Sequence, residues 1–595
     1  MPDKQPSWRR LQAMKARRRI ITKSAKKAEG ATLRHAHRFL VKRWDNVRGV
    51  RRRILTWMIG VALLIVIVGV QMLWFQRSYL QMAPVSGGTY AEAMQGPIET
   101  LNPLYATSDA ELAASRLVFS SLYNYDTTGH LSADLARSMQ IDESNKVYTI
   151  TMKPNARWHD GRPVTAKDVV FTVGLMKNSA VRSVMNASWK DIEAEAASDF
   201  SVKFTLPAAY AAFPQALTFS VLPEHVLKEI EPRLLRQNSF STSPVGSGPF
   251  QFRLSQAIND VDKRKVIHLA ANQNYYGHKP KLDRFQLHIY GKMDDIGTAL
   301  RTGEVGSAAD ISSDIARGID TTRYTVRSKP INSGVYAIIN TTQPMLADVA
   351  VRKALQLATD TASVRQSLYG NPPELELPFV SGQLTGSDIP SRPAYNISQA
   401  RETLDAAGWI PGADGVRKKG DQSLRLRVVT RKNSDYEKSL ELISGQWRKI
   451  GVAIEKQVVD PTAVDQSFTQ TVLQPRNYDV LIDELYIGGD PDVFAYWHSR
   501  GLLNFANYSN ITSDDALVSG RSRPNAELRS LKYKAFAKQW IEDVPAIGLY
   551  QSTMIYAQNK QLGSITNDEK IISPAERYAD VQYWTAETGN VYKTP

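Results

Sequence analysis

YTITMKPNARWHDGRPVTAKDVVF, which runs from Tyr148 to Phe171, combines a strand pattern, a turn and a helix start within a short stretch. Large apolar residues alternate with threonine over 148–152, the period of two that is typical of a strand with one buried face. Segment 153–163 favours a turn because proline, asparagine, aspartate and glycine recur in it. The sequence therefore predicts a strand followed by a rigid turn.

A helix is predicted directly after this turn. Thr165 is a suitable N-cap, and Asp168 can accept a hydrogen bond from the N–H of the cap while complementing the helix dipole. The positions that recur at helical spacing, and should form the buried face, are Val169, Thr172, Val173 and Met176.

This stretch resembles the KxGxxWHDGxPxTAxDVxF block of extracellular solute-binding proteins of family 5, with Asn155 in place of a glycine. These proteins are the oligopeptide-, dipeptide- and nickel-binding receptors of ABC importers. Other blocks of the family occur in the family's order at Gly87–Ala106, Ser115–Ser138, Val245–Phe252, Asn274–Tyr290, Asp348–Asp360, Ala400–Trp409, Tyr478–Pro491 and Glu542–Tyr550. Because a series of ordered blocks is more specific than one motif, the chain is identified as a member of this family from about Gly87 onward.

The alternation of strand and helix patterns predicts α/β lobes with mixed sheets. One long helix is expected over Ser434–Ile450, starting at a capping box from Ser434 to Glu437. The resemblance implies a two-lobed periplasmic-binding-protein (type II) fold with an extra small domain, closing around ligand by a hinge motion. It assigns residues 87–124, 243–331 and 550–595 to lobe I, 125–242 to the small domain and 332–549 to lobe II.

The first 53 residues form a basic tail. They contain 18 lysines and arginines but only three acids, a net charge of +15 that equals the charge of the whole chain. The rest of the chain is therefore electrically balanced. Such tails beside a membrane helix most often set topology and attract anionic lipid headgroups. Nucleic acid is allowed electrostatically, but the tail has no aromatic or patterned motif that would make it an expected partner.

Residues Ile54–Phe75 contain no charged side chain and are long enough to cross a hydrocarbon core of about 30 Å. One transmembrane helix is predicted, followed by a linker at 76–86. The positive-inside rule places the tail in the cytoplasm and the binding domain outside, in an extracellular or periplasmic position at the cell membrane. A signal peptide cleaved near Ala83 is the alternative. Because the chain has no cysteine, the helix would replace the usual lipoprotein anchor, and disulfides are excluded.

No catalytic or metal-binding motif is present. Of the nine histidines only His35 and His37 lie close together, so neither a metal nor another cofactor is expected. The chain has no GxSxG, Walker or HExxH motif, so an enzyme is not expected. For Trp158 and His159, which lie in the turn of the family block, we expect structural roles.

The resemblance implies a ligand-binding site built from four segments: Ser108–Glu111, the turn at 247–248, the strand around residue 336 and the loop Tyr486–Asp490. The implied ligand-binding residues are Ser108, Asp109, Glu111, Ser247, Gly248, Tyr336, Tyr486, Gly489 and Asp490. An extended peptide would be held through its backbone, with roomy pockets for its side chains and the two tyrosines as flat walls.

The loop at 486–490 departs from the family pattern. Peptide binders of the family place an aspartate there to pair with the free amine of the ligand, whereas this chain has Ile487. The nearby acids are Glu484, Asp490 and Asp492. The sequence therefore leaves two alternatives, a peptide bound through another acid, or a different solute such as a sugar, an opine-like compound or a metal chelate.

Together these features predict a membrane-anchored substrate-binding protein of an ABC importer. It would capture peptides, or a similar solute, outside the cell and deliver them to permease subunits that work with ATPases. The main alternative is a membrane-tethered sensor or scaffold of the same fold, which would signal through the helix and the basic tail.

Overall fold

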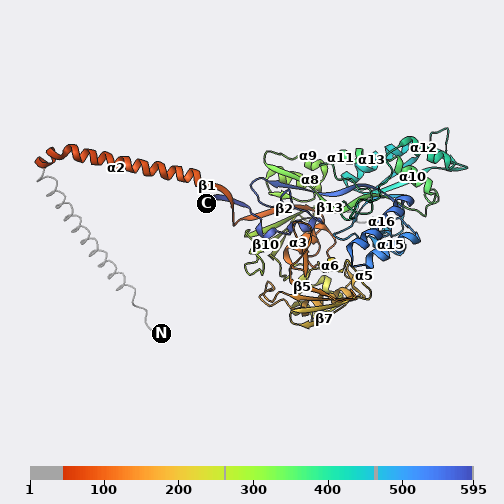
Figure 1. Cartoon of the computed structure of the whole chain (residues 1–595), viewed down its shortest axis with the longest axis horizontal. Coiled ribbons are helices and arrows are strands. Elements are labelled where there is room, and N and C mark those ends of the chain that lie inside the picture. Colours follow the sequence, from red (N-terminus) through yellow and green to blue (C-terminus); the bar gives the residue numbers. More distant parts are fainter. Residues whose placement is uncertain (1–43, 260–262, 461–466, 593–595) are drawn as a thin grey trace, which may run out of the picture. The chain divides into compact units, whose positions relative to one another are not determined.

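A computed structural model describes residues 44–259, 263–460 and 467–592 (Figure 1). The chain divides into two compact units, residues 1–83 with 589–595 and residues 84–588. The larger unit is built on a ten-stranded sheet of order β18-β17-β19-β13-β20-β12-β2-β11-β10-β9. These strands are β2 (Thr89–Gln95), β9 (Phe250–Asn259), β10 (Arg264–Ala271), β11 (Arg284–Tyr290), β12 (Ser307–Ala308), β13 (Tyr324–Ile339), β17 (Arg425–Arg431), β18 (Ala453–Val459), β19 (Val480–Tyr486) and β20 (Ala546–Asn559). Parallel and antiparallel pairs both occur, which confirms the predicted mixed sheet.

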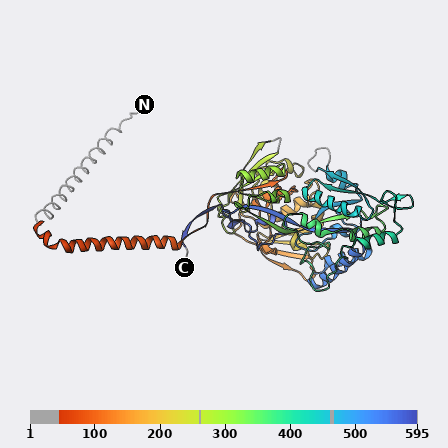
Figure 2. The ribbon, with the colours of Figure 1, turned by 90° about the horizontal axis from the view of Figure 1, so that it is seen from above.

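Helices cover both faces of the sheet around β13. Val335 and Ile339 pack into one core with the apolar face of α13 (Ser434–Arg448). Tyr336 points to the opposite face and packs into another core with α16 (Ala526–Asp543), because successive side chains of a strand alternate between faces. Figure 2 shows the cyan stretch that contains α13 and the blue stretch that contains α16 on opposite sides of the sheet.

The long helix predicted over Ser434–Ile450 is α13, but its start differs from the prediction. Asn433 is the N-cap, and its Oδ1 accepts hydrogen bonds from the N–H groups of Asp435 and Tyr436. The predicted capping box at Ser434 is therefore wrong by one residue. The other α-helices of the larger unit are α3 (Asp109–Val118), α4 (Ala166–Lys177), α5 (Asn186–Trp189), α6 (Phe213–Ala216), α7 (Glu224–Leu227), α8 (Met293–Thr302), α9 (Ser313–Arg317), α10 (Val349–Leu357), α11 (Thr361–Ser367), α12 (Ile397–Ala406), α14 (Phe494–Trp497) and α15 (Ile511–Ser522).

The strands β13 and β20 run through the middle of the sheet with a break in their pairing. Pro330 lies opposite Thr553, but Gly334 lies opposite Gln551, so the register shifts between these two positions. Within the break, Asn332 donates its N–H to the carbonyl of Ile572, and its own carbonyl accepts the N–H groups of residues 487 and 488. A short irregular segment therefore joins the two halves of the sheet.

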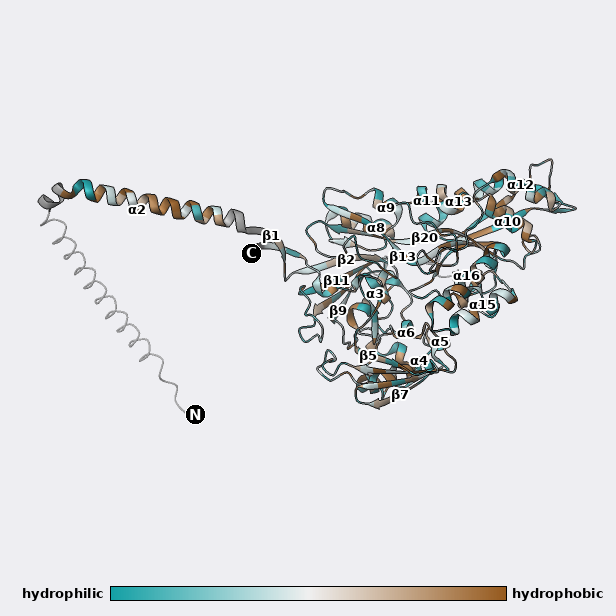
Figure 3. Ribbon diagram, viewed as in Figure 1, coloured by the Kyte–Doolittle hydropathy of each residue, from teal (hydrophilic) through white to brown (hydrophobic). Residues whose placement is uncertain are grey.

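The described part of the smaller unit is dominated by α2 (Trp44–Tyr79). Its segment Val50–Phe75 is the one stretch of the described residues that is long and apolar enough to cross a membrane. Figure 3 shows the apolar middle of this helix in brown. The predicted span Ile54–Phe75 lies within the segment, whereas residues 1–43 of the predicted tail lie outside the described residues. The strands β1 (Leu80–Val85) and β21 (Glu587–Tyr592) form a separate two-stranded sheet.

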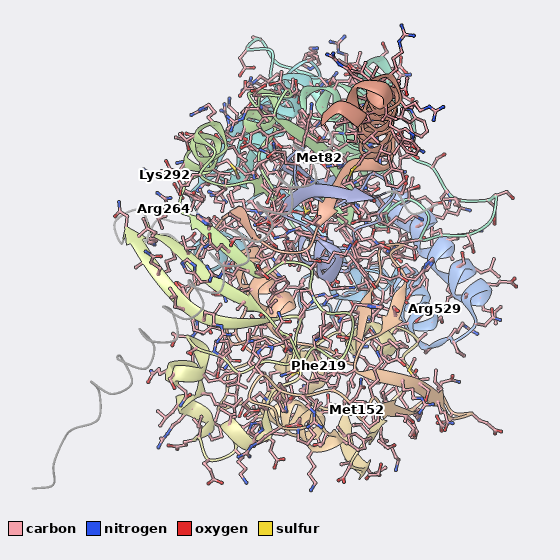
Figure 4. The ribbon with its side chains drawn as sticks, turned by 90° about the vertical axis from the view of Figure 1, so that its left-hand side faces the viewer. Met82, Met152, Phe219, Arg264, Lys292 and Arg529 are labelled. Atoms are coloured by element: carbon pink, nitrogen blue, oxygen red, sulfur yellow. The ribbon has the colours of Figure 1, made fainter. Side chains whose placement is uncertain are left out.

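A four-stranded antiparallel sheet contains the stretch that opened the sequence analysis. Its order is β5-β6-β8-β7, with β5 (Ala136–Ile141), β6 (Val147–Met152), β7 (Glu193–Ser198) and β8 (Ser201–Thr205). Met152 on β6 and Phe219 belong to one hydrophobic core and are labelled in Figure 4. After the turn, α4 begins as predicted, and the carboxylate of Asp168 accepts the N–H of Thr165 at 2.8 Å. The predicted strand and helix are confirmed, while the boundaries of the lobes and the small domain stay predictions.

The turn before α4 packs inward. Trp158 is 2% exposed. The Nδ1 atom of His159 accepts the N–H of Gly246 at 3.2 Å, and its Nε2 lies 3.1 Å from the carbonyl oxygen of Gly248. Desolvation by burial lowers the pKa of His159 to about 4, so the ring is neutral at pH 7. These contacts agree with the structural roles expected for both residues.

Candidate functional site

The larger unit contains a cavity of about 540 Å³ beside the break in β13 and β20. Its volume is in the range of small-ligand pockets. The three central strands contribute Ile331, Ser333, Val335, Glu484, Tyr486, Tyr550, Ser552, Thr553 and Ile555 to the wall. The start of α3, the link from β12 to α9, the end of β17 and the start of α13 contribute Asp109, Leu112, Asp310, Ile311, Ser312, Ser313, Arg431, Asn433, Asp435 and Tyr436. The wall therefore combines elements that are far apart in the sequence.

Four carboxylates reach this wall from four different elements. Asp109 is the first residue of α3, and Asp435 lies in the first turn of α13. Asp310 lies between β12 and α9 with a φ of 54°, a left-handed conformation that aspartate tolerates better than most residues. Glu484 lies on β19 opposite Val335, so both side chains project to the same face of the sheet.

The two arginines that interact with these acids have carboxylate partners of their own. Arg431 Nη2 lies 2.9 Å from an oxygen of Asp483. Arg577 Nη2 lies 2.5 Å from an oxygen of Glu92, and both side chains of this pair are fully buried. Among the described residues, Asp109, Asp310, Asp435 and Glu484 form no ion pair. The cavity wall therefore carries an excess of negative charge.

Desolvation by the surrounding protein and repulsion by neighbouring acids disfavour the ionised forms of Asp109, Asp310 and Asp435. Desolvation, with the neighbouring charges of Asp109, Glu484 and Asp435, raises the pKa of Asp310 to about 8, although Arg577 acts in the opposite direction. Desolvation and Glu484 also raise the pKa of Asp109. The pKa of Asp435 is raised by desolvation, although the Ser313 hydroxyl donates to its Oδ2 at 2.8 Å. At neutral pH the carboxyl group of Asp310 therefore holds a proton, which a bound cation could displace.

The structure brings two of the nine predicted ligand residues, Asp109 and Tyr486, to the cavity wall. Ser108 and Glu111 lie beside Asp109 but serve the backbone. The Ser108 hydroxyl caps α3 by accepting the N–H of Glu111, and the Glu111 carboxylate accepts the N–H groups of Glu99, Thr100, Thr107 and Ser108. Both residues therefore hold the loop that positions Asp109, and neither lines the described cavity.

Tyr336 lies on the other face of the sheet from the cavity. Its neighbour Val335 lines the cavity, so the alternation of side chains along β13 turns Tyr336 toward α16. There it is 1% exposed, and its hydroxyl donates to the carbonyl of Leu377 at 3.0 Å. Its contacts are those of a core residue. Ligand contact by Tyr336 stays a prediction that nothing here tests.

The remaining four predicted residues make close internal contacts. The Ser247 hydroxyl accepts the N–H of Ser120, and a Cβ at Gly248 would come within 2.7 Å of the Leu117 carbonyl oxygen. Gly489 packs against the ring of Tyr125, where a Cβ would clash. Asp490 forms a two-pronged ion pair with Arg529 of α16, at 2.9 and 2.6 Å; Arg529 is labelled in Figure 4. Ligand contact by these four stays an untested prediction.

Sequence reasoning missed most of the polar cavity wall. Glu484 was recognised as an acid near the loop at 486–490, but Asp310, Asp435 and Arg431 were not singled out. Asp435 could have been found from the helix start that was predicted at Ser434, because a side chain in the first turn of α13 faces the ends of the neighbouring strands. No local pattern marks Asp310, which enters the cavity through the left-handed turn after β12.

The described residues contain no group of three or more histidine, cysteine, aspartate or glutamate side chains arranged to hold a metal ion.

A mixed sheet whose two long central strands join its halves, with a cavity beside the join, defines a type II periplasmic-binding-protein fold of the solute-binding class. The model of the bacterial extracellular solute-binding proteins, family 5 (middle region), matches residues 130–504, which is more than half of the chain. The chain belongs to this family. Both the predicted family and the predicted fold class are confirmed.

Individual relatives agree with this assignment. The oligopeptide-binding protein AppA of Bacillus subtilis is 24% identical over 484 residues, which cover 78% of this chain and 87% of AppA. A putative ABC transporter peptide-binding protein of Brucella ovis is 29% identical over 396 residues, 66% of this chain and 72% of that protein.

Solved structures show the same fold. The structure of AppA in complex with a nonapeptide gives a TM-score of 0.72 at 23% identity, covering 85% of this chain and all of that one. The structure of NikZ from Campylobacter jejuni in complex with Ni(L-His) also gives 0.72, at 24% identity, covering 84% of this chain and 99% of NikZ. The relatives are solute-binding proteins, a class of non-enzymatic transport components.

Proposed function

We propose that this chain is the membrane-tethered substrate-binding subunit of an ABC importer and that it binds peptides, or a solute of similar size, in the cavity beside β13. The observation that carries the proposal is the cavity itself, whose wall joins both halves of the central sheet in a chain of the solute-binding family. The nonapeptide complex of AppA and the Ni(L-His) complex of NikZ support a broad choice of solutes on this fold.

The break in the central strands supports closure around the solute. Residues 331–333 leave the regular ladder of β13 and β20, and Ile331 and Ser333 line the cavity. A hinge needs a few residues at the ends of elements that can absorb changes in φ and ψ. We place the hinge at this break, which is also where the proposed lobe I (87–124, 243–331 and 550–595) meets the proposed lobe II (332–549).

Binding is tested with the full chain in detergent, by thermal unfolding in the presence of a peptide library and of non-peptide solutes. A solute that binds only the folded state raises Tm with its concentration. We expect saturable stabilisation by at least one peptide. If native mass spectrometry finds no retained solute and no compound of the library changes Tm, the binding function is wrong.

The helix α2 is proposed to tether the protein, with the basic tail in the cytoplasm and the larger unit outside. The 18 basic residues before Ile54 support this orientation under the positive-inside rule. Because the chain has no cysteine, each single substitution to cysteine introduces one unique thiol for labelling. In cells made permeable only at an outer membrane, a membrane-impermeant maleimide should label Glu143→Cys but not Ser24→Cys. Labelling of both, or a mature chain lacking the residues before about Ala83, would contradict the tether.

Delivery to a permease is part of the same proposal. The relatives named as ABC transporter or oligopeptide-binding proteins favour an importer over the sensor or scaffold alternative. Co-purification of the full chain with the membrane subunits of an ABC transporter, strengthened by solute and ATP, would support delivery. A stable complex with a cytosolic protein through the basic tail, without any permease, would favour signalling instead.

A further inference from the structure

The charges of the cavity point to the class of solute, provided that the cavity is the binding site proposed above. Four carboxylates line it, and the two nearby arginines are already matched by Asp483 and Glu92. An anionic solute would add to this repulsion and find no unpaired cation on the described wall. A neutral solute would leave the excess charge in place. Only a cation lowers the electrostatic energy of the site when it binds.

The acids are distributed over opposite parts of the wall. Asp109 and Asp310 belong to α3 and to the link after β12, within the proposed lobe I. Asp435 and Glu484 belong to α13 and β19, within the proposed lobe II. Closure brings these two sets of like charges together, which opposes closure of the empty site. A positive group placed between the two sets removes this repulsion and favours the closed state.

Two polar atoms of the same wall have no hydrogen-bond partner among the described residues. Ser552 on β20 is 6% exposed, lines the cavity, and its hydroxyl has no hydrogen-bond partner among the described residues. The Oδ1 atom of Asp435 is likewise buried without a partner, although Oδ2 is bonded to Ser313. Buried polar atoms are nearly always bonded in folded proteins, so these two are available to a polar ligand.

We propose that the solute carries a positively charged nitrogen group, a protonated amine or a guanidinium, which Asp109, Asp310 and Glu484 hold between the two sides of the cavity. A basic peptide and a free polyamine share this chemistry, and the basic peptide agrees better with the proposed function.

Tripeptides of different charge, together with the polyamine spermidine, test the proposal on the full chain in detergent. The probes are trilysine, trialanine, N-acetyl-trialanine amide, triaspartate and spermidine, measured by calorimetry and thermal unfolding. We expect trilysine to bind at least about tenfold more tightly than the neutral N-acetyl-trialanine amide, since charge-assisted hydrogen bonds are lost with the latter. If spermidine binds as tightly as trilysine, the site takes polyamines. If spermidine binds much more weakly than trilysine, the site takes basic peptides. Either outcome supports a cationic solute.

Two isosteric variants test the named carboxylates. Asp109→Asn and Glu484→Gln keep the size of each side chain and remove its charge, and Gln can still accept the hydrogen bond that Tyr436 donates to Glu484 at 3.0 Å. Each variant should lower the affinity for trilysine about tenfold, and the double variant should lower it further. Asp421→Asn is the matched control, because it removes one exposed aspartate outside the cavity wall.

The outcomes separate this inference from the binding function. If a neutral or acidic peptide binds tightly and trilysine does not, the cavity is a receptor site but the cationic class is wrong. Trilysine binding that is equal in wild type, Asp109→Asn and Glu484→Gln would also overturn the assignment of these residues. If none of the probes and no library compound binds, the binding function itself fails, and the inference with it.

Discussion

Two carboxylates near Arg577 have opposite environments. Glu92 is fully buried, and Arg577 at 2.5 Å, Tyr556 at 2.8 Å and Tyr578 all donate hydrogen bonds to it. Asp310 is open to the cavity and has no cation partner among the described residues, although the charge of Arg577 still reaches it. A satisfied buried acid holds a fold together, whereas an unsatisfied acid on a cavity wall costs stability and is available to a ligand.

The largest expected effect comes from breaking the satisfied pair. Glu92→Gln removes the charge that balances Arg577, so an unpaired guanidinium stays in the interior. We expect a loss of about 3–5 kcal/mol in the free energy of unfolding, measured by urea denaturation. Glu195→Gln is the control, because its pair with Lys203 is exposed and should contribute about 1 kcal/mol or less. Equal losses in both variants would contradict the contrast between buried and exposed acids.

The sequence analysis placed Asp490 and Tyr486 in the same ligand loop, but substitutions of these two residues should have different effects on stability and on ligand affinity. Both effects should be smaller than that of Glu92→Gln. Asp490→Ala breaks the two-pronged pair with Arg529 and should cost about 2 kcal/mol of stability without a direct effect on ligand affinity. Tyr486 is 49% exposed and lines the cavity, so Tyr486→Ala should weaken ligand binding with little change in urea stability. The reverse result for the two variants would mean that Asp490, not Tyr486, contacts the solute.

The sequence predicted the family, the class of sheet and the local elements because these depend on patterns along the chain. The strand at residue 148 and the helix after Thr165 are examples, since alternation, turn residues and caps act within a few residues. The end of α13 was also close to the prediction, and only its N-cap differed, by one residue.

The site was harder to predict because it depends on contacts between distant segments. Tyr336 and Val335 are neighbours on β13, yet their side chains occupy opposite faces of the strand, and a shift of one residue would exchange these faces. Asp310 and Asp435 line the same cavity only because folding brings together the turn after β12 and the start of α13. No motif within either segment carries that information.

The pH dependence of ligand binding further tests the contrast between Asp310, which is open to the cavity, and the buried Glu92. The pKa of Asp310 is about 8 in the empty cavity, and a cation beside it stabilises the carboxylate, so binding below pH 8 releases protons. The affinity for trilysine should therefore rise with pH, by up to about tenfold per unit for each proton released, and level off above pH 8. Calorimetry in buffers of different ionisation enthalpy counts the protons. Affinity that falls between pH 6 and 8, or no proton release, would contradict the role of the acids.

The smallest expected effect is a gain in stability when Asp310 is neutralised. Its pKa is raised in the folded state, so the folded protein holds a proton that the unfolded chain releases above about pH 4, and stability declines from about pH 4 to pH 8 and levels off above pH 8. Asp310→Asn removes this decline, and asparagine tolerates the left-handed backbone at this position. Because the side chain is open to solvent, we expect a gain in Tm of only about 1–2 °C at pH 9 and none at pH 4. Scanning calorimetry of the ligand-free chain measures the difference; a lower Tm at pH 9 would mean that the ionised carboxylate stabilises the fold, as Glu92 does, and that the two acids are not opposites.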